Sequence, residues 1–273
     1  MTARPLVLPA LTPDVGWSVC LRDARTSAVL AEQDPDRVQR TASVGKLFLL
    51  LEVARRLEDG LLDVDEPLGW EEGEWVADSG LWHLMGSRQL PLGDLCWLVG
   101  GFSDNLATNV LLRRVGVDAV TATTHALGFT RSALLDRVRL DRGPDHPPTL
   151  SRGTAGELSD LIARLHRGEL VSPAVSGRVR AWIAANADLS MTAAAFGLDP
   201  LAHAESDRGL TMINKTGTIS TARIDVGVVA GPAAEVAWAV LAEWDTGSDP
   251  RDEVLSTMRR VGDAVRAHVE DGT

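Results

Sequence analysis

Ser43 and Lys46 are the first residues whose types and spacing could carry chemistry. They stand directly before the apolar run 47–51, and the apolar spacing over 44–57 predicts a buried helix. Residues i and i+3 lie on one face of a helix, so the amine is expected beside the hydroxyl. A serine hydroxyl becomes a nucleophile when a neighbouring base takes its proton. The alternative is a serine that caps the helix, followed by a surface lysine.

Lysine is rare in this chain, and its two positions are informative. Of 27 basic residues, only Lys46 and Lys215 are lysines, while the rest are arginines. A codon bias that favours arginine accounts for most of this imbalance. Arginine cannot be deprotonated in a protein, whereas a lysine with a lowered pKa can act as a base. We therefore expect lysine where chemistry requires an ammonium group that can lose its proton.

Two further motifs place polar side chains at the ends of predicted elements. The sequence N-K-T-G-T occupies 214–218, at the end of a predicted strand, and glycine there would let a ligand approach the backbone. The sequence S-D-N occupies 103–105, ahead of a predicted helix. Taken separately, the first is equally typical of a strand that enters a turn, and the second of helix capping.

Together the three motifs resemble one family. The order S-x-x-K, S-D-N and K-T-G, with its separations, is similar to that of the penicillin-recognising serine acyl-transferases, specifically the class A β-lactamases. The resemblance extends over most of the chain, from a predicted hairpin that starts at residue 15 to a closing helix that ends at 269. It implies a β-lactamase/transpeptidase-like fold and an acyl-serine intermediate.

The resemblance also implies roles for the matching residues. Ser43 would be the nucleophile, and Lys46 would be its base or a proton relay. Ser103 would pass a proton to the leaving amine, and Asn105 would hold the substrate side chain. The backbone N–H groups of Ser43 and Thr218 would form the oxyanion hole, which needs two donors aimed at one point.

The second lysine motif would bind the other end of the substrate. Lys215 and Thr216, beside Gly217, look like the anchor for a substrate carboxylate. Proximity of the Lys215 ammonium, together with burial, would lower the pKa of Lys46. Arg223, on the following predicted strand, could grip the same carboxylate in bidentate fashion. The alternative for Arg223 is a surface arginine on an edge strand.

The elements that must position these residues come from both ends of the chain. We expect an α/β protein of the α+β type, with one antiparallel sheet, flanking helices and an inserted, mostly helical subdomain. The chain would be one domain over 1–273, with a sheet subdomain at 14–45 and 211–273 and a helical subdomain at 46–210. The strands are predicted at 15–21, 28–33, 211–215, 223–230 and 235–244, and the helices at 44–57, 92–99, 105–115, 154–166, 175–185 and 252–269.

One departure from the family concerns hydrolysis of the acyl-enzyme. Class A enzymes use a glutamate on a loop that reads R-x-E-x-x-L-N as the deacylation base. In the matching stretch of the long loop 134–153, Arg139 stands where the glutamate would be, and an arginine cannot deprotonate water. Asp136, Asp141 and Asp145 are shorter substitutes out of register, and Glu157 is expected to be a surface charge. We therefore expect slow deacylation.

Composition excludes or disfavours several other functions. Acidic residues number 38, the net charge is −11, and no run of 18 apolar residues occurs, so we expect neither nucleic acid nor a membrane as partner. The chain has no tyrosine, which excludes a tyrosine-based esterase or class C mechanism. The six histidines are scattered singly, so we expect no metal, and we expect no cofactor.

The amino-terminal segment and the cysteines indicate a cellular compartment. Prolines break the apolar stretch near the start, so it does not resemble a signal peptide, and a leading helix is expected to be truncated or absent. Cys20 and Cys96 are expected to be reduced, buried thiols. We expect a cytoplasmic protein, unless an export signal was removed, that acts on a small molecule with a carboxylate as a monomer or weak dimer. Trp82 could stack on that substrate, although ordinary packing is favoured.

Three functions follow from these observations. The first is a serine hydrolase that resembles class A β-lactamases and has slow or atypical deacylation. The second is a cytoplasmic esterase, peptidase or acyl-transferase of a biosynthetic pathway. The third is a β-lactam-binding protein without efficient turnover. The complete motif set favours the first, whereas the missing glutamate and the missing export signal oppose it.

Overall fold

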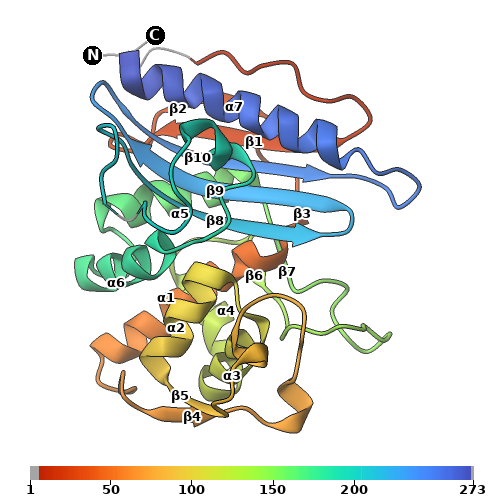
Figure 1. The fold of residues 1–273 in the computed structure, drawn as a ribbon, viewed down its shortest axis with the longest axis vertical. Helices are drawn as coiled ribbons and strands as arrows, with labels where there is room; N and C mark the ends of the chain where they lie inside the picture. Colours follow the sequence, from red (N-terminus) through yellow and green to blue (C-terminus); the bar gives the residue numbers. More distant parts are fainter. Residues whose placement is uncertain (1–5, 204, 272–273) are drawn as a thin grey trace.

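A five-stranded antiparallel sheet forms the upper part of the molecule (Figure 1). The computed structural model describes residues 6–203 and 205–271. The strand order is β2-β1-β10-β9-β8, and β1 pairs with β10 so that Gly16 lies opposite Glu243. The sheet is therefore built from both ends of the chain, as predicted. Its strands are β1 (Gly16–Asp23), β2 (Val29–Gln33), β8 (Thr211–Ile219), β9 (Ala222–Ala230) and β10 (Glu235–Glu243).

Helices cover both faces of this sheet. On one face, α7 (Arg251–Asp271) crosses the strands, and Trp238 of β10 stacks on Phe196 with ring centroids 5.8 Å apart (Figure 1). On the other face, α5 (Ala155–Arg167) packs against β10 and β1. Because both faces are covered, the central strands β9 and β10 are buried along almost their whole length. The predicted α+β architecture is thus confirmed.

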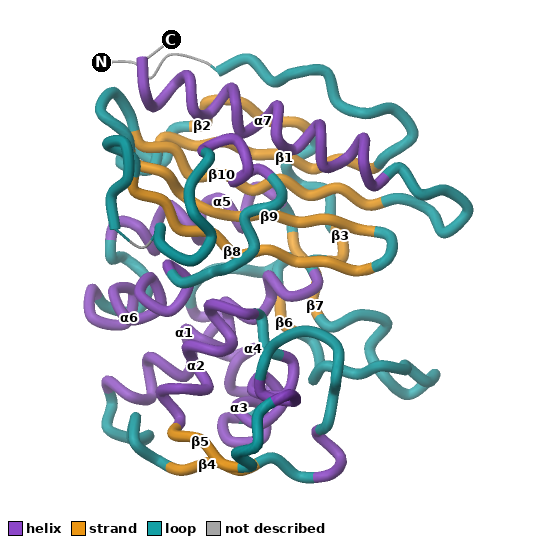
Figure 2. Tube along the Cα trace, in the orientation of Figure 1, coloured by secondary structure: helices purple, strands orange, loops and turns teal. Residues whose placement is uncertain are grey.

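A mostly helical region lies below the sheet, with α1 at its centre (Figure 2). The apolar run 47–51 of α1 is completely buried, because α2, α3, α4 and α6 surround the helix. These helices are α1 (Lys46–Glu58), α2 (Leu92–Phe102), α3 (Asn105–Val115), α4 (Val117–Ala126) and α6 (Pro173–Ala184). Short strands connect them: β3 (Gln39–Arg40), β4 (Pro67–Gly69), β5 (Gln89–Pro91), β6 (Ala133–Leu134) and β7 (Ser151–Gly153).

Two boundaries near the site and one helix differ from the sequence expectations. The helix predicted from residue 44 begins at Lys46, and the turn before it is a short 3-10 helix, η1 (Ala42–Gly45). The strand predicted to end at 215 continues to Ile219, so the K-T-G motif lies inside β8. Helix α4 was not predicted, because its valines and threonines have low helix propensity and form no clear apolar stripe. The bounds of the two subdomains remain a prediction. Helix α5, which lies within the predicted helical subdomain, packs on the sheet.

The described part of the amino-terminal segment is irregular, and the two cysteines are buried. Residues 6–15 contain no helix, and Pro5, on which part of the expectation of a truncated or absent leading helix rests, lies outside the described residues. Cys20 and Cys96 are both buried and free. Within 6–203 and 205–271, no helix has the length and apolarity needed to cross a bilayer, and no group of acidic, histidine and cysteine side chains could hold a metal ion.

Candidate active site

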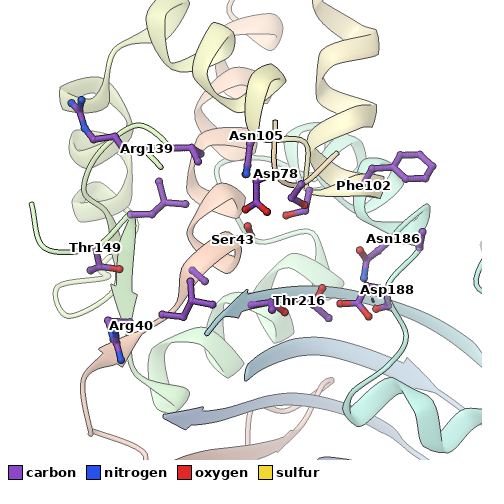
Figure 3. Close-up of a pocket in the computed structure, with 18 of the residues that line it drawn as sticks. Arg40, Ser43, Asp78, Phe102, Asn105, Arg139, Thr149, Asn186, Asp188 and Thr216 are labelled. Carbon is purple, nitrogen blue, oxygen red and sulfur yellow. Dashed lines mark hydrogen bonds between the residues drawn. The ribbon is translucent and has the colours of Figure 1, made fainter. Parts of the chain in front are cut away.

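A pocket of about 600 Å³ opens between β8 and the helical region, and Ser43 lies at its floor (Figure 3). Ser103, Asn105, Thr216 and Thr218 also line it. The three motifs, which are far apart in the sequence, therefore meet at one place. The walls add polar and charged side chains from four other segments: Arg40, Asp78, Ser79, Arg139, Arg142, Thr149, Asn186 and Asp188.

The chain enters the Ser43 position through a strained turn. Ala42, which precedes Ser43, has φ of 46°, a left-handed conformation that is unusual for a residue with a Cβ. Ser151 of β7 holds this turn, because its hydroxyl donates to the Ala42 carbonyl at 2.6 Å and lies 2.8 Å from Thr41 Oγ1. Backbone strain that the surroundings enforce is typical of functional sites. Ser43 therefore takes its position from β7 as well as from α1.

Both lysines of the chain are fully buried and converge on Ser103. Lys46 Nζ donates to the Ser103 carbonyl at 2.6 Å, to Asn105 Oδ1 at 2.7 Å and to Ser103 Oγ at 3.4 Å. Lys215 Nζ donates to Ser103 Oγ at 3.0 Å and to the Thr216 carbonyl at 2.9 Å. The Ser103 hydroxyl thus lies between two amines, which suits a group that relays protons.

The two amines differ in proton affinity. Burial, with the nearby Lys215 charge, lowers the pKa of Lys46 well below 10.5, although Asp104 and Asp78 oppose the shift. Burial lowers the pKa of Lys215 to about 8, against the opposing charges of Asp188 and Asp225. Lys46 is therefore suited to act as a base, whereas Lys215 is largely protonated at neutral pH.

The expected contact between Lys46 and Ser43 is not made directly. Among the described residues, no hydrogen bond joins the Lys46 amine to the Ser43 hydroxyl, because the amine instead donates to Ser103 and Asn105. Ser43 also lies on η1 and not on α1, so the pair does not share one α-helical face. Catalytic hydrogen bonds often tighten only when substrate binds, so this geometry is compatible with Lys46 as the base.

The S-D-N motif forms the joint between α2 and α3. Ser103 ends α2 in the left-handed region, with φ of 55°. Asp104 caps α3 by accepting from Ala107 N at 2.9 Å, as the capping interpretation expects. The same carboxylate accepts from the backbone N–H groups of Leu81 and Trp82 at 2.7 and 2.8 Å. Asp104 therefore fixes the segment before η3 (Trp82–Leu84) against the site.

Gly217 allows β8 to approach the nucleophile closely. A Cβ at this position would collide with the Thr41 carbonyl oxygen and would lie 3.2 Å from Ser43 N. Any residue other than glycine would push the strand away from Ser43. The neighbouring Thr218 consequently lines the pocket beside Ser43, which is the arrangement that two oxyanion-hole donors require.

Arg223 lies away from the pocket. Its guanidinium is mostly buried, donates to the carbonyls of Ile219 and Ala222 at 2.7 and 2.8 Å, and packs 5.8 Å from the Trp244 ring. It therefore holds the turn between β8 and β9, and the structure does not bring it to the proposed carboxylate anchor. The alternative, a surface arginine, is also wrong, because Arg223 is buried.

The loop 134–153 contributes arginines, and none of its carboxylates line the pocket in the described residues. Arg139 lines the pocket and donates to Asp136 at 2.7 and 3.1 Å, while Arg142 donates to Asp136 at 2.6 Å. Burial raises the pKa of Asp136, but these hydrogen bonds outweigh it and hold the pKa below its ordinary value. Asp136 is thus occupied as a loop anchor, and Asp141 and Asp145 are exposed outside the pocket.

Glu157 and Trp82 form hydrogen bonds within the fold and do not line the pocket. Glu157 is half-buried, and its carboxylate accepts from the backbone N–H groups of Thr130, Arg131 and Ser132, so the expectation of a plain surface charge was wrong. Trp82 is 1% exposed and donates from Nε1 to the Ser87 carbonyl at 2.9 Å, which confirms ordinary packing.

Sequence reasoning missed the acidic wall of the pocket. Asp78 and Asp188 line it, together with Asn186, and none of the three belongs to a recognised motif. Asn186 Nδ2 donates to Asn214 Oδ1 at 2.8 Å, which connects this wall to the residue before Lys215. The only sequence signal was the position of these residues in irregular segments near the motifs.

The comparisons with known proteins agree with this geometry. The family model described as the Beta-lactamase enzyme family matches residues 9–269. A β-lactamase of Rhodobacter capsulatus is 24% identical over 225 residues, which are 78% of this chain and 71% of that protein. A solved β-lactamase structure from Sphaerobacter thermophilus superposes with a TM-score of 0.80 at 21% identity, covering 93% and 91% of the two chains. The structure of PBP-A gives 0.78 at 19% identity, covering 93% and 89%. The chain belongs to the Beta-lactamase enzyme family.

Proposed function

We propose that the protein is a serine hydrolase that forms an acyl-enzyme on Ser43 with β-lactams or related amides and esters. One observation carries the proposal: the Ser103 hydroxyl lies between two fully buried lysine amines beside Ser43. Burying two amines is unfavourable for folding, so their burial beside a serine indicates a function that requires them. A purely structural protein would have no reason to place its only two lysines there.

The acylation step follows from the positions of the groups. Lys46 takes the Ser43 proton as Oγ attacks the substrate carbonyl carbon. The carbonyl oxygen becomes an oxyanion and binds the backbone N–H groups of Ser43 and Thr218. When the intermediate collapses, the bond to the leaving group breaks and the pair of electrons stays on its nitrogen or oxygen. Ser103 donates its proton to that atom and is reprotonated from Lys46.

The remaining polar groups orient the substrate. The Lys215 ammonium is proposed to bind a carboxylate on the leaving side, together with the hydroxyls of Thr216 and Thr218, which line the pocket. The Asn105 amide, which already accepts from Lys46 through Oδ1, can donate from its nitrogen to the acyl portion. The proposed partner is accordingly a small molecule with a carboxylate.

Deacylation is proposed to be slow. It requires a base that activates water, and Arg139 stands where the class A resemblance places a glutamate. Asp136 does not replace it, because two guanidinium groups occupy its carboxylate. A similar fold forms such intermediates: one solved PBP-A variant is an acyl-enzyme complex with penicillin G.

Intact-mass spectrometry with a penicillin tests the proposal. We expect an adduct with the mass of the added penicillin on Ser43, and no adduct on the Ser43→Ala variant. Released product with unmodified protein would show fast turnover and contradict slow deacylation. Absence of any adduct from a penicillin and from a reactive ester, or an adduct on Ser43→Ala, would overturn the assignment of Ser43.

A further inference from the structure

Two carboxylates in the pocket lack a charge partner. Asp78 is exposed and Asp188 is half-buried, and both line the cavity above Ser43. In the part of the chain that the structure describes, Asp188 Oδ1 accepts from the Ser190 N–H and hydroxyl alone, at 3.1 and 2.6 Å. Within residues 6–203 and 205–271, neither aspartate forms a salt bridge. Carboxylates that face a binding cavity without a cationic partner are available to a ligand.

Within the described residues, the arginines of the pocket form no salt bridge with Asp78 or Asp188. The Arg40 guanidinium is paired with Glu243 at 2.6 Å. The Arg139 and Arg142 guanidiniums share Asp136, at 2.7 and 2.6 Å, which leaves one net positive charge at this end of the pocket. Figure 3 shows Arg40 of β3 and Arg139 of loop 134–153 at the end of the pocket opposite Asp188, and Arg142 belongs to the same loop. The two ends of the cavity therefore differ in charge.

The aspartates lie near the residues that are proposed to act on the leaving portion of the substrate. The backbone carbonyl of Asp188 accepts from Asn214 Nδ2 at 3.2 Å, next to Lys215, and Figure 3 shows Asp188 beside Thr216. Asp78 precedes Ser79, whose carbonyl accepts from Asn105 N at 2.9 Å. Each aspartate also acts electrostatically on one of the two buried amines, Asp188 on Lys215 and Asp78 on Lys46. Both line the same pocket as Ser103, which is the proposed proton donor to the leaving atom.

We propose that Asp78 and Asp188 select substrates whose leaving portion carries a positive charge as well as a carboxylate. The inference rests on the proposed acylation of Ser43. Lys215 supplies one positive charge, which a substrate carboxylate balances. Two aspartate charges then remain, and a leaving portion that bears only a carboxylate meets net repulsion. An ammonium group on the same portion, placed between Asp78 and Asp188, converts this repulsion into attraction.

A pair of isosteric esters isolates the effect of charge. Both have N-benzoylglycine as the acyl portion. One releases 2-hydroxy-3-(trimethylammonio)propanoate, and the other releases 2-hydroxy-4,4-dimethylpentanoate, which replaces the quaternary nitrogen by carbon. The quaternary group prevents migration of the acyl chain to nitrogen. Acylation of Ser43 is measured as competition with a fluorescent penicillin, and release of N-benzoylglycine is measured by liquid chromatography.

We expect the cationic ester to acylate Ser43 faster than its neutral isostere. A unit charge about 6 Å from one carboxylate, at an effective dielectric constant of about 40, gives a preference of about tenfold for each aspartate. Asp78→Asn and Asp188→Asn should each reduce the ratio of the two rate constants several-fold, and the double variant should bring it close to the ratio of the two esters' uncatalysed rates of hydrolysis. Asp263→Asn, on the exposed face of α7, is the matched control and should keep the wild-type ratio.

The outcomes separate this inference from the proposed function. Equal rates for the two esters, a faster neutral ester, or a ratio that survives in the double variant would each overturn the inference. Failure of both esters to compete, while the fluorescent penicillin still labels Ser43, would also overturn it and leave the acylation proposal standing. Absence of labelling at Ser43 by any reagent would instead overturn the proposed function.

Discussion

Lys215 should reduce the stability of the fold that contains it. Its ammonium is fully buried, and burial lowers its pKa from 10.5 to about 8. A shift of about 2.5 units, at about 1.4 kcal/mol for each unit, corresponds to roughly 3 kcal/mol of unfavourable burial at neutral pH. Replacing Lys215 with methionine keeps the apolar stem and removes the charge. It also removes two hydrogen bonds, to Ser103 Oγ and to the Thr216 carbonyl, worth about 1 kcal/mol each.

We therefore expect Lys215→Met to raise the free energy of unfolding by about 1–2 kcal/mol at pH 7 while it weakens substrate binding. The pH dependence provides a second check. The unfolded chain keeps the lysine proton up to about pH 10.5, whereas the folded chain releases it near 8. Between these values the unfolded state binds more protons, so the wild-type protein gains stability as pH rises. The advantage of the variant should shrink over this window and reverse by about pH 10.5.

Urea unfolding followed by tryptophan fluorescence measures both effects. The chain has eight tryptophans and no tyrosine, so no phenol titrates in the alkaline window. The difference between wild type and variant is taken at each pH, which cancels the titration of groups that do not interact with Lys215. A variant that is less stable at pH 7, with a difference that does not change up to pH 10.5, would refute the reasoning.

Four further predictions concern catalysis. Lys46→Arg should slow labelling of Ser43 by about 10²–10⁴, because arginine cannot take a proton, whereas Lys215→Arg should mainly weaken binding; equal losses in rate and affinity would contradict these roles. Arg139→Glu should raise the steady rate of cephalosporin hydrolysis after a burst, and fast linear hydrolysis by the wild type would show that deacylation is not impaired. Gly217→Ala should destabilise the fold by about 1–3 kcal/mol and slow acylation, and unaltered labelling would disprove the close-approach argument. The KM of a carboxylate substrate should rise up to about tenfold per pH unit above about 8 as Lys215 loses its proton, and a KM that stays constant to pH 9.5 would refute its role as anchor.

The catalytic groups were predictable because their chemistry restricts residue type. Only a lysine can supply an amine that both binds and releases a proton, so the two lysines in an arginine-rich chain identified Lys46 and Lys215. The strands near the two ends of the chain were equally predictable, because runs of apolar and β-branched residues favour buried strands over other secondary structure. The structure brings Ser43 and Ser103 to the same pocket, as the motifs indicated.

Residues placed by tertiary hydrogen bonds were not predictable. Asp188 reaches the pocket wall because its backbone carbonyl accepts from Asn186 and Asn214, and no local pattern encodes that contact. The position of Asp78 depends on the segment that follows it, where the backbone N–H groups of Leu81 and Trp82 donate to the Asp104 carboxylate. Arg223 does not line the pocket, because its guanidinium near the hairpin turn donates to two backbone carbonyls, and the sequence does not show which partner it takes.

The pairing of β1 with β10 has a kinetic consequence. Contacts between segments so distant in sequence form slowly, because closing a long loop reduces chain entropy before the contact compensates for it. During translation, a nascent chain that has emerged only as far as α6 contains Ser43 and Ser103 but lacks Lys215 and three of the five strands of the sheet. Such a chain exposes the apolar face of α5 that later covers β10, and exposed surface of this kind is prone to aggregation. We expect the growing polypeptide to need protection by chaperones until β10 has been synthesised, and catalytic competence to arise only at that late stage.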